Sequence, residues 1–289
     1  MPPRKTNMKV FITGARGQLA RAFLDRFEKA GDEVFACDID SLDIADAEAV
    51  EKASAAFKPE LFINCAAYNL VDKAEQDYDC ARRANAQGPR NLALAAKKRN
   101  AMFVHFGTDY VFDGALHRPY TEKDTPNPLN NYGRTKLEGE ELSLNSGARC
   151  LVLRLSWVYG QGKQNFIYKL SQWATTQPEL HISDDEISVP TSTEDIADIT
   201  LKAVSRGLTG RWHMVNGGYC SRYEWAKNSL KWLGIEKKIV PAKTADFKLP
   251  AKRPLFSAMD NSALSRELGI SIPQWSESAE KFARAMAAT

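Results

Sequence analysis

Short apolar segments alternate with helix-like segments through the first half of the chain. Such alternation is typical of βαβ units, in which successive strands lie parallel in one sheet. The predicted strands are rich in branched and aromatic residues and apolar on both faces, as expected for strands covered by helices. They are Lys9–Thr13, Glu33–Cys37, Leu61–Asn64, Met102–Gly107 and Cys150–Leu155, and Arg211–Val215 is expected to rejoin them. We therefore predict an α/β fold built on a doubly wound parallel sheet.

Helical periodicity fills the segments between the predicted strands. Gln18–Ala30 is expected to follow the first strand directly as a helix. Asp77–Asn100 predicts one long helix, interrupted or kinked near Gly88-Pro89, because a proline inside a helix removes a hydrogen bond and clashes with the preceding turn. A further helix is expected to start near Asn131.

Composition is ordinary for a soluble globular protein and argues against several other classes. A net charge of +3 is too small to suggest nucleic acid or an anionic membrane as a partner. The five cysteines are scattered singly, so we expect free thiols in a reducing cytoplasm. We expect no secretory signal, no transmembrane helix and no metal site. The four histidines do not cluster, and Asp184-Asp185-Glu186 is interpreted as a solvated loop.

A glycine-rich turn joins the first predicted strand to the first predicted helix. Gly14 permits the tight turn, Gly17 lets the backbone approach a pyrophosphate, and Ala20 is small enough for the helix to pack on the sheet. Phosphates would then lie at a helix N-terminus, where N–H groups are free and the helix dipole is favourable. The turn therefore predicts a dinucleotide site.

Acidic residues after the second strand bear on which dinucleotide is bound. Asp38 lies about 20 residues beyond the glycine turn, where an acidic side chain can bind the adenosine ribose hydroxyls. That placement favours NADH, whereas Arg16, inside the turn, could pair with the 2′-phosphate of NADPH. Asp43 could reach the adenine edge. Both NADH and NADPH stay open on these residues.

The pattern Tyr-x-x-x-Lys occurs three times, at Tyr132/Lys136, Tyr159/Lys163 and Tyr223/Lys227. Only the first copy follows both the glycine turn and Thr108 at the end of a predicted strand. Spacing of four on a helix places the phenol and the ammonium on one face.

Those three side chains predict a carbonyl-reducing site. The ammonium of Lys136 is expected to lower the pKa of Tyr132 from its ordinary value of about 10, so that the phenol can protonate a carbonyl oxygen. Lys136 would also bind the nicotinamide ribose, and Thr108 would hold the substrate oxygen in place.

Over almost its whole length the chain resembles the extended short-chain dehydrogenases/reductases, and within them the dTDP-4-dehydrorhamnose reductase family. The shared motifs are Gly14-Ala-Arg-Gly-Gln-Leu19, Asn64-Cys-Ala-Ala67, Val71-Asp-Lys-Ala-Glu75, Thr108-Asp-Tyr-Val-Phe-Asp-Gly114, Asn127-Pro-Leu-Asn-Asn-Tyr-Gly-Arg-Thr-Lys136, Ser156-Trp-Val-Tyr-Gly160, and Arg253-Pro with Asp260-Asn261.

The resemblance implies a role for each matching residue. Thr108, Tyr132 and Lys136 would form the catalytic triad, and Asn85 would support the site. The cofactor would contact Gly14, Arg16, Gly17, Gln18, Leu19, Asp38, Asp43, Ala66, Ala67, Tyr68, Tyr132 and Lys136. The substrate would contact Val71, Thr108, Asp109, Tyr132, Trp157 and Arg253, with Arg253 at the nucleotide diphosphate. The implied reaction is reduction by NADH or NADPH of the C4 keto group of a nucleotide-linked 4-keto-6-deoxyhexose.

The sequence departs from the family pattern near the expected sugar and nucleotide. Gly107 stands where the family usually has serine, Asn69-Leu70 replaces Thr-Ala, and Asp185–Thr191 differs from the usual acidic turn. Three alternatives therefore remain: a reductase acting on a different nucleotide sugar, an epimerase or dehydratase on the same scaffold, or a non-catalytic regulatory subunit.

Two lobes are expected from this reading. Residues 1–160 would form the Rossmann lobe that binds NAD(P), rejoined by about 191–218. Residues 161–190 and 219–289 would form a smaller α/β lobe for the sugar nucleotide, because they follow the strand ends, where open α/β sheets bind ligands. A homodimer is compatible with the sequence, which does not fix the oligomeric state.

Overall fold

The computed structural model describes residues 7–288, and its centre is a six-stranded, all-parallel sheet. The strands are β1 (Lys9–Thr13), β2 (Glu33–Cys37), β3 (Leu61–Asn64), β4 (Met102–Thr108), β5 (Arg149–Leu155) and β10 (Gly210–His213). Their order across the sheet is β2-β1-β3-β4-β5-β10. The predicted doubly wound fold is confirmed, with strand ends shifted by at most a few residues.

The strand order reverses between β1 and β3. From β1 the chain first adds β2 on one side and then crosses to place β3 on the other. In open α/β sheets a crevice forms at such a reversal, outside the carboxyl ends of the strands, because the connecting helices leave in opposite directions. The ligand site is therefore expected above the ends of β1 and β3.

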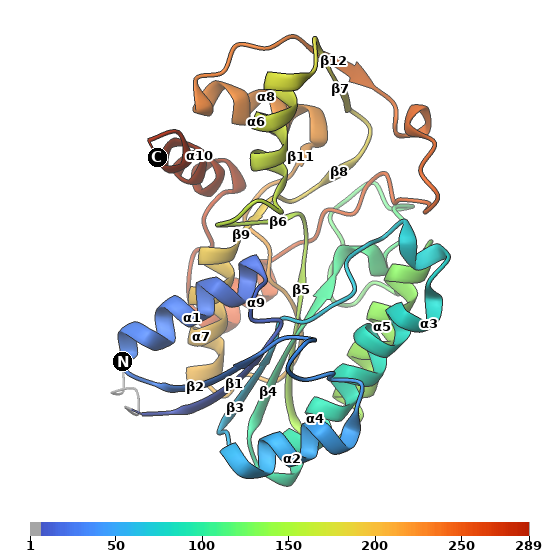
Figure 1. Cartoon of the computed structure of the whole chain (residues 1–289). Coiled ribbons are helices and arrows are strands. Elements are labelled where there is room, and N and C mark those ends of the chain that lie inside the picture. The colour runs from blue at the N-terminus through green and yellow to red at the C-terminus, as the bar shows by residue number, and fades with distance from the viewer. Residues whose placement is uncertain (1–6, 289) are drawn as a thin grey trace.

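Helices cover both faces of the sheet (Figure 1). One layer contains α1 (Gln18–Ala30), α7 (Thr193–Ser205) and α9 (Ser262–Leu268), and the other contains α2 (Ala47–Phe57), α4 (Gly88–Lys98) and α5 (Asn131–Leu144). Strand β1 contributes side chains to both layers, because successive side chains of a strand point to opposite faces. Val10 and Ile12 pack in the first layer, and Phe11 packs in the second.

The segment predicted as one long helix is interrupted directly before Gly88-Pro89, as expected, and the interruption is a π turn. It forms α3 (Tyr78–Arg82), a π segment (Arg83–Gln87) and then α4. Pro89 lies in the first turn of α4, directly after the π segment. The π segment brings Asn85 against the catalytic helix α5, where its amide donates to the Thr135 hydroxyl at 3.1 Å.

A smaller upper part lies beyond the carboxyl ends of the strands (Figure 1). Its helices are α6 (Phe166–Thr176), α8 (Arg222–Leu233) and α10 (Trp275–Ala287). Three short strand pairs accompany them: β6 (Val158–Tyr159) with β9 (Thr191–Ser192), β7 (Leu180–Ser183) with β12 (Ile239–Ala242), and β8 (Ile187–Ser188) with β11 (Cys220–Ser221).

Helix α9 packs with the sheet, although its residues fall inside the range expected for the smaller lobe. Leu264 and Leu268 are fully buried in the same cluster as Val10 and Ile12. The chain thus returns to the large lobe once more before it ends in α10.

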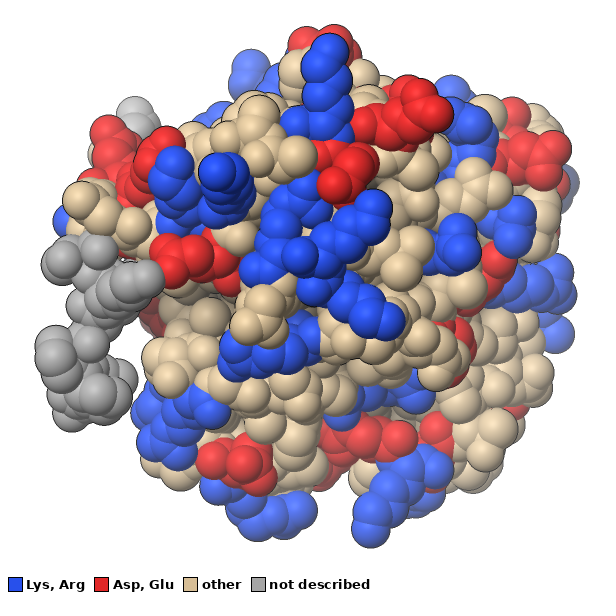
Figure 2. Space-filling model, turned by 90° about the horizontal axis from the view of Figure 1, so that it is seen from below, with Lys and Arg blue, Asp and Glu red and all other residues tan. Residues whose placement is uncertain are grey.

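The length and polarity of the helices and the charge on one face of the molecule bear on what the protein can contact. In the part of the chain that the structure describes, no helix is both long enough and apolar enough to cross a membrane. Figure 2 shows the face below the sheet in Figure 1, where Lys and Arg side chains gather near the middle and Asp and Glu lie around them. This face mixes both signs of charge and does not form a single basic stripe.

Candidate active site

A cavity of about 1210 Å³ opens at the reversal of strand order. Its lining comes from the β1–α1 turn, the ends of β2 to β5, and the start of α5. With the exception of Arg253, every residue predicted to bind cofactor or substrate lines this cavity: Gly14, Arg16, Gly17, Gln18, Leu19, Asp38, Asp43, Ala66, Ala67, Tyr68, Val71, Thr108, Asp109, Tyr132, Lys136 and Trp157.

The glycine turn forms a cradle that side chains would fill. Gly14 has φ 68°, and a Cβ there would lie 2.6 Å from the backbone nitrogen of Ala66. Gly17 caps α1 without a side-chain hydrogen bond, so the first N–H groups of this helix face the cavity unpaired by a cap. These features fit a dinucleotide pyrophosphate, which needs close backbone approach and free N–H donors.

Charged side chains meet at the end of the cavity expected to hold adenosine. Asp38 accepts the backbone N–H of Arg16 at 3.0 Å, and Arg16 Nη2 lies 2.6 Å from Asp40. Burial raises the pKa of Asp38, but N–H groups of Arg16 and Ile39 outweigh it, and the pKa is lowered overall. Asp38 is therefore an anion held by the turn itself, while the Arg16 side chain stays largely exposed at the rim.

Ala66, Ala67 and Tyr68 follow β3 and form one wall of the cavity. Ala66 donates its N–H to Asn64 Oδ1 at 3.1 Å, and Tyr68 donates its N–H to Asn85 Oδ1 at 2.8 Å. Asn85 returns a bond to the Tyr68 carbonyl at 3.2 Å. The helix asparagine thus supports this wall and α5 together.

Helix α5 brings the phenol and the ammonium to the cavity. Its N-cap Asn130 accepts the N–H of Gly133 at 2.8 Å. Because a Cβ on Gly133 would lie 2.3 Å from the Tyr110 carbonyl oxygen, glycine allows the start of α5 to reach the end of β4. Tyr132 and Lys136 therefore lie one turn apart beside Thr108, as the four-residue spacing predicted.

Thr108 and Lys136 are nearly inaccessible and have defined partners, whereas Tyr132 is partly exposed. Lys136 is 3% exposed and its Nζ donates to the Phe106 carbonyl at 2.6 Å. The Thr108 hydroxyl accepts the N–H of Tyr110 at 3.2 Å and donates to Asp109 Oδ1 at 3.3 Å. The hydroxyl also lies close enough to Tyr132 to affect the pKa of that phenol.

The expected direction of the Tyr132 pKa shift is wrong. Burial raises the pKa of Tyr132 to about 12, with Thr108 lowering it and Asp109 and Glu140 adding to the rise. Burial also lowers the pKa of Lys136 to about 8, against the opposing charges of Glu140 and Cys65. Desolvation is the dominant effect for both groups, and a sequence does not reveal its degree. The phenol consequently holds its proton at neutral pH, as a proton donor must.

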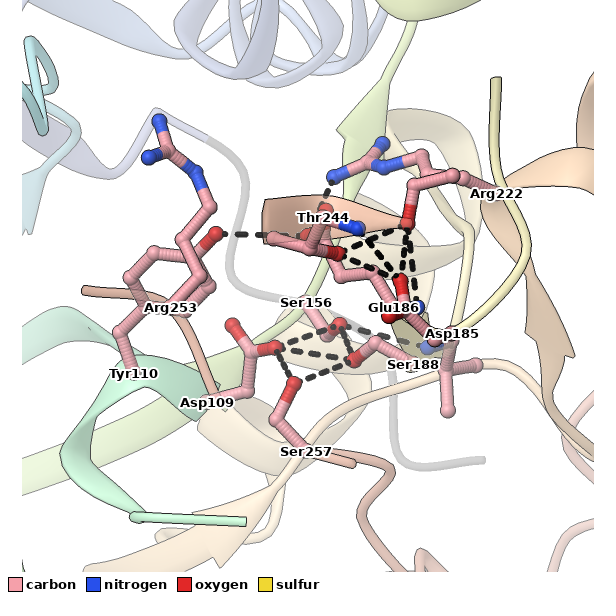
Figure 3. A network of polar contacts seen from close by, with 12 residues as sticks. Asp109, Tyr110, Ser156, Asp185, Glu186, Ser188, Arg222, Thr244, Arg253 and Ser257 are labelled. Carbon is pink, nitrogen blue, oxygen red and sulfur yellow. Dashed lines mark hydrogen bonds and ion pairs between the residues drawn. The ribbon is translucent and has the colours of Figure 1, made fainter. Parts of the chain in front are cut away.

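Asp109 is turned away from solvent towards three serines (Figure 3). Its Oδ2 accepts the hydroxyls of Ser156 at 3.2 Å, Ser188 at 2.9 Å and Ser257 at 2.5 Å. Burial raises the pKa of Asp109 while the serine hydroxyls lower it. This carboxylate joins the end of β4 to three distant segments, in addition to lining the cavity.

Arg253, the remaining predicted residue, lines a second cavity of about 550 Å³. Its guanidinium makes a bidentate pair with Asp72, at 3.0 and 2.8 Å. Trp157 belongs to the walls of both cavities and has φ 39°, a strained value for a residue with a side chain. The indole thus separates the two spaces.

Sequence reasoning missed Arg222, which lies 3.6 Å over the Trp157 ring in the second cavity. The only signal was the Ser221-x-x-Glu224 pattern, which predicts a helix start and does not show what it faces. Glu186 was interpreted as part of a solvated loop, and that is wrong. It is 8% exposed, lines the second cavity and lies 3.4 Å from Arg222 (Figure 3).

The five cysteines have no disulfide partner. Within residues 7–288, no group of three or more His, Cys, Asp and Glu side chains is arranged to hold a metal ion.

Sequence comparisons relate this chain to reductases of nucleotide sugars. The pattern of the RmlD substrate binding domain matches residues 8–288. The spore coat polysaccharide biosynthesis protein SpsK of Bacillus subtilis (strain 168) is 35% identical, over 95% of this chain and 96% of that protein. A dTDP-4-dehydrorhamnose reductase of Burkholderia thailandensis is 32% identical, over 93% of this chain and 95% of that protein.

Comparison with solved structures gives the same relationship. A dTDP-4-dehydrorhamnose reductase from Clostridium acetobutylicum superposes with a TM-score of 0.93 at 38% identity, over 96% of this chain and 99% of that one. The enzyme of that name from Bacillus anthracis, crystallised with NADP, gives 0.92 at 32% identity, over 96% and 98%. With this fold, this cavity and these matches along its length, the chain belongs to the dTDP-4-dehydrorhamnose reductase family.

Proposed function

We propose that the protein catalyses NAD(P)H-dependent reduction of the C4 keto group of a nucleotide-linked 4-keto-6-deoxyhexose, specifically dTDP-4-dehydro-L-rhamnose to dTDP-L-rhamnose. The observation that carries the proposal is the convergence of Thr108, Tyr132 and Lys136 on a cavity that begins at the glycine cradle. The names of the related enzymes supply the substrate class.

The chain's own groups divide the work in this proposal. A reduced nicotinamide bound in the larger cavity supplies the hydride that reduces the carbonyl carbon. Tyr132, protonated at neutral pH, donates its proton to the carbonyl oxygen, and Thr108 holds that oxygen by a hydrogen bond. Lys136 binds the nicotinamide ribose and places a positive charge beside the reacting groups.

The second cavity suits the nucleotide. The partly exposed rings of Trp157 and Phe166 offer apolar surface for a base, and Arg222 and Arg253 offer guanidinium groups for a diphosphate. We therefore assign 161–190 and 219–289, apart from α9, to a sugar-nucleotide lobe. Val71, Asp109 and Trp157 would contact the sugar between the nucleotide and the nicotinamide.

The decisive experiment is an NADH and NADPH oxidation assay against several nucleotide-linked 4-keto-6-deoxy sugars. We expect stoichiometric oxidation of cofactor with the dTDP-linked 4-keto sugar, and the product configuration is read by NMR. An epimerase or dehydratase would convert the sugar without net cofactor oxidation. A regulatory subunit would give no turnover with any sugar, and either result would overturn the proposal.

Replacing Tyr132 by Phe is expected to reduce kcat by at least about 100-fold, the usual contribution of a positioned proton donor. Cofactor affinity, measured by nicotinamide fluorescence, should change little. The matched control is Tyr223→Phe, which alters another Tyr-x-x-x-Lys copy that lines neither cavity. Equal turnover of the Tyr132 and Tyr223 variants would remove Tyr132 from the mechanism.

We also propose a cytoplasmic location, which the free thiols of all five cysteines support. A homodimer stays a prediction, which sedimentation of the purified protein tests.

A further inference from the structure

Glu140 is a fully buried carboxylate for which the proposed reaction has no stated use. It follows Lys136 by four residues on α5, as Lys136 follows Tyr132, so the three side chains lie along one face of the helix. An ionised carboxylate is costly to bury unless paired, so a position with no exposure calls for a physical reason.

Two arginines from the sheet surround this carboxylate. Arg154 on β5, itself fully buried, places Nε 3.0 Å and Nη2 2.9 Å from Glu140 Oε2. Arg211 on β10 places its Nε 3.1 Å from the same oxygen. Arg154 also lies over the Phe112 ring, at 5.1 Å. Glu140 is thus fixed against the sheet by two guanidinium groups.

Gly107 provides the space for the carboxylate. A Cβ at Gly107 would lie 2.1 Å from Glu140 Oε1, and 3.0 Å from both Glu140 Cδ and Arg154 Cγ. Gly107 is not among the residues of positive φ, so the close approach, and not the backbone conformation, requires glycine there. Because Gly107 immediately precedes Thr108, the carboxylate lies directly under the end of the catalytic strand.

Glu140 brings negative charge into a region with three cations. Lys136, Arg154 and Arg211 lie near the end of β4. Arg211 is also paired with Glu141, whose side chain is half-exposed, so Glu140 is the fully buried carboxylate among these groups. Lys136 otherwise faces Cys65 from β3 and His105 from β4. Burial and the nearby ammonium lower the pKa of His105 well below its ordinary value, so that imidazole is neutral.

We propose that Glu140 is a positioning residue, the buried counter-ion that keeps Lys136 a cation while its Nζ donates to the Phe106 carbonyl. The inference rests on the role of Lys136 in the proposed function. Three geometric observations support it. Gly107 leaves space for the carboxylate, Arg154 and Arg211 both contact that carboxylate, and Glu140 follows Lys136 by four residues on α5. The direction of the electrostatic effect agrees, because Glu140 raises the pKa of Lys136 against the effect of burial.

The first test is the pH dependence of kcat and of cofactor affinity. Lys136 has a pKa of about 8, so it is charged below that pH and loses its charge above it. Glu140→Gln is expected to move this alkaline limb down by about one unit or more, as removing a nearby opposite charge does. The variant should therefore lose more activity at pH 8 than at pH 6.

Arg154→Met is the matched control, because it breaks the same buried pair and keeps the carboxylate. A merely structural role predicts that both variants lower the midpoint of thermal unfolding and leave the limb where it is. The counter-ion role predicts a downward shift for Glu140→Gln and no downward shift for Arg154→Met, because the second substitution removes a cation and not an anion. Equal shifts in the two variants, or no shift in either, would overturn the inference.

Cofactor titration separates this inference from the proposed function. NADPH affinity measured by fluorescence across the same pH range needs no sugar substrate. A downward shift in Glu140→Gln alone supports the counter-ion role even if no 4-keto sugar is reduced. Turnover by the wild type together with pH-independent affinity and an unmoved limb in Glu140→Gln would refute the counter-ion role and leave the proposed function standing.

The space at Gly107 is tested by a double-mutant cycle. Gly107→Ala should destabilise the wild type strongly, because the new methyl group displaces Glu140. In a Glu140→Ala background the same substitution has room, and its effect on the urea midpoint should be much smaller. Additive effects would mean that Gly107 does not accommodate the carboxylate, and would contradict the proposed geometry.

Discussion

At the scale of single residues, two neighbouring charged side chains, Asp38 and Arg16, are held in different ways. Asp38 is held as an anion by N–H groups of the glycine turn, while the guanidinium of Arg16, two-thirds exposed, bonds to Asp40 at the rim. Surface pairs of this kind contribute little energy and rearrange readily. Arg16 can therefore turn towards a 2′-phosphate, whereas Asp38 favours the free hydroxyls of NADH.

Replacing Arg16 by Ala should weaken NADPH binding by about tenfold, the equivalent of one charge-assisted hydrogen bond, and leave NADH binding nearly unchanged. Asp38→Ala should act in the opposite sense, weakening NADH more than NADPH. Fluorescence titration with both cofactors measures this. Arg21→Ala, exposed on α1 and outside the cavity lining, is the control. Equal losses for both cofactors in Arg16→Ala would mean that Arg16 does not read the 2′-phosphate.

Residue types in a pattern revealed where most of the site would lie, but not its electrostatics. Tyr132, Lys136 and Thr108 were found because a helix repeat and a strand end are visible in sequence. The direction of the Tyr132 pKa shift could not be found in the sequence, because it depends on burial by residues distant in the chain. The burial of Glu140 was not visible either, since its partners Arg154 and Arg211 lie on two other strands.

At the scale of elements, the contact between α5 and the π segment determines where the catalytic face of α5 points. A Cβ on Gly139 would lie 1.9 Å from the Asn85 carbonyl oxygen, so the two helices touch backbone to backbone. Asn85 uses its side chain on Thr135 of the same helix. The widened turn and the missing side chain together allow this approach.

Gly139→Ala is accordingly expected to cost about 1–3 kcal/mol of stability, the range for overpacking a closed contact. This exceeds any gain in helix propensity. Urea unfolding measures the effect, with Arg134→Ala on the exposed face of α5 as a control that should stay within about 0.5 kcal/mol. If the two variants are equally stable, the contact does not limit the approach of α5.

Elements with a strong periodic pattern were predicted almost residue by residue, and short ones were not. The buried strands of the large sheet are apolar runs between helices, so β1, β2 and β3 match their predicted bounds. The two-residue strands β6, β8, β9 and β11 carry no period that a sequence could display. An interruption near Gly88-Pro89 was predicted, but nothing in the sequence showed that it would be a π segment.

At the scale of the whole molecule, Asp109 connects the two parts of the chain. Its carboxylate takes hydroxyls from Ser156 after β5, Ser188 on β8 and Ser257 near the C-terminal helices. All three bonds converge on the carboxylate of Asp109 (Figure 3), which directly follows Thr108 in the chain. The position of the upper part is thereby tied to the strand end that carries the Thr108 hydroxyl.

Burial makes the stability contribution of Asp109 depend on pH. A carboxyl group whose pKa is raised on folding stabilises the protein most below its ordinary pKa of about 4, and this contribution is lost as pH rises through the raised folded value. The free energy of unfolding of wild type minus that of Asp109→Asn should therefore fall as pH rises above about 4. Urea unfolding across this range measures it.

Asp124 supplies the control of opposite sign. The Arg118 guanidinium is the main cause that lowers the pKa of Asp124, so its contribution is present at higher pH and lost as pH falls. The corresponding difference for Asp124→Asn should rise with pH only below about pH 4 and stay nearly level above it. A difference for Asp109→Asn that does not fall as pH rises above about 4 would show that burial does not dominate at that carboxylate.

The two cavities share only Trp157, Val158, Gln164 and Lys169 among their lining residues, and all four come from one short stretch of chain. The rest of the second cavity is lined by residues of α6, α8, β7 and the loops around them. Substitutions there can change which base or which sugar nucleotide enters without altering the groups that deliver the proton. A protein divided in this way can come to bind a different sugar nucleotide and still carry out the same reduction. Trp157, which lines both cavities, lies where the two parts meet.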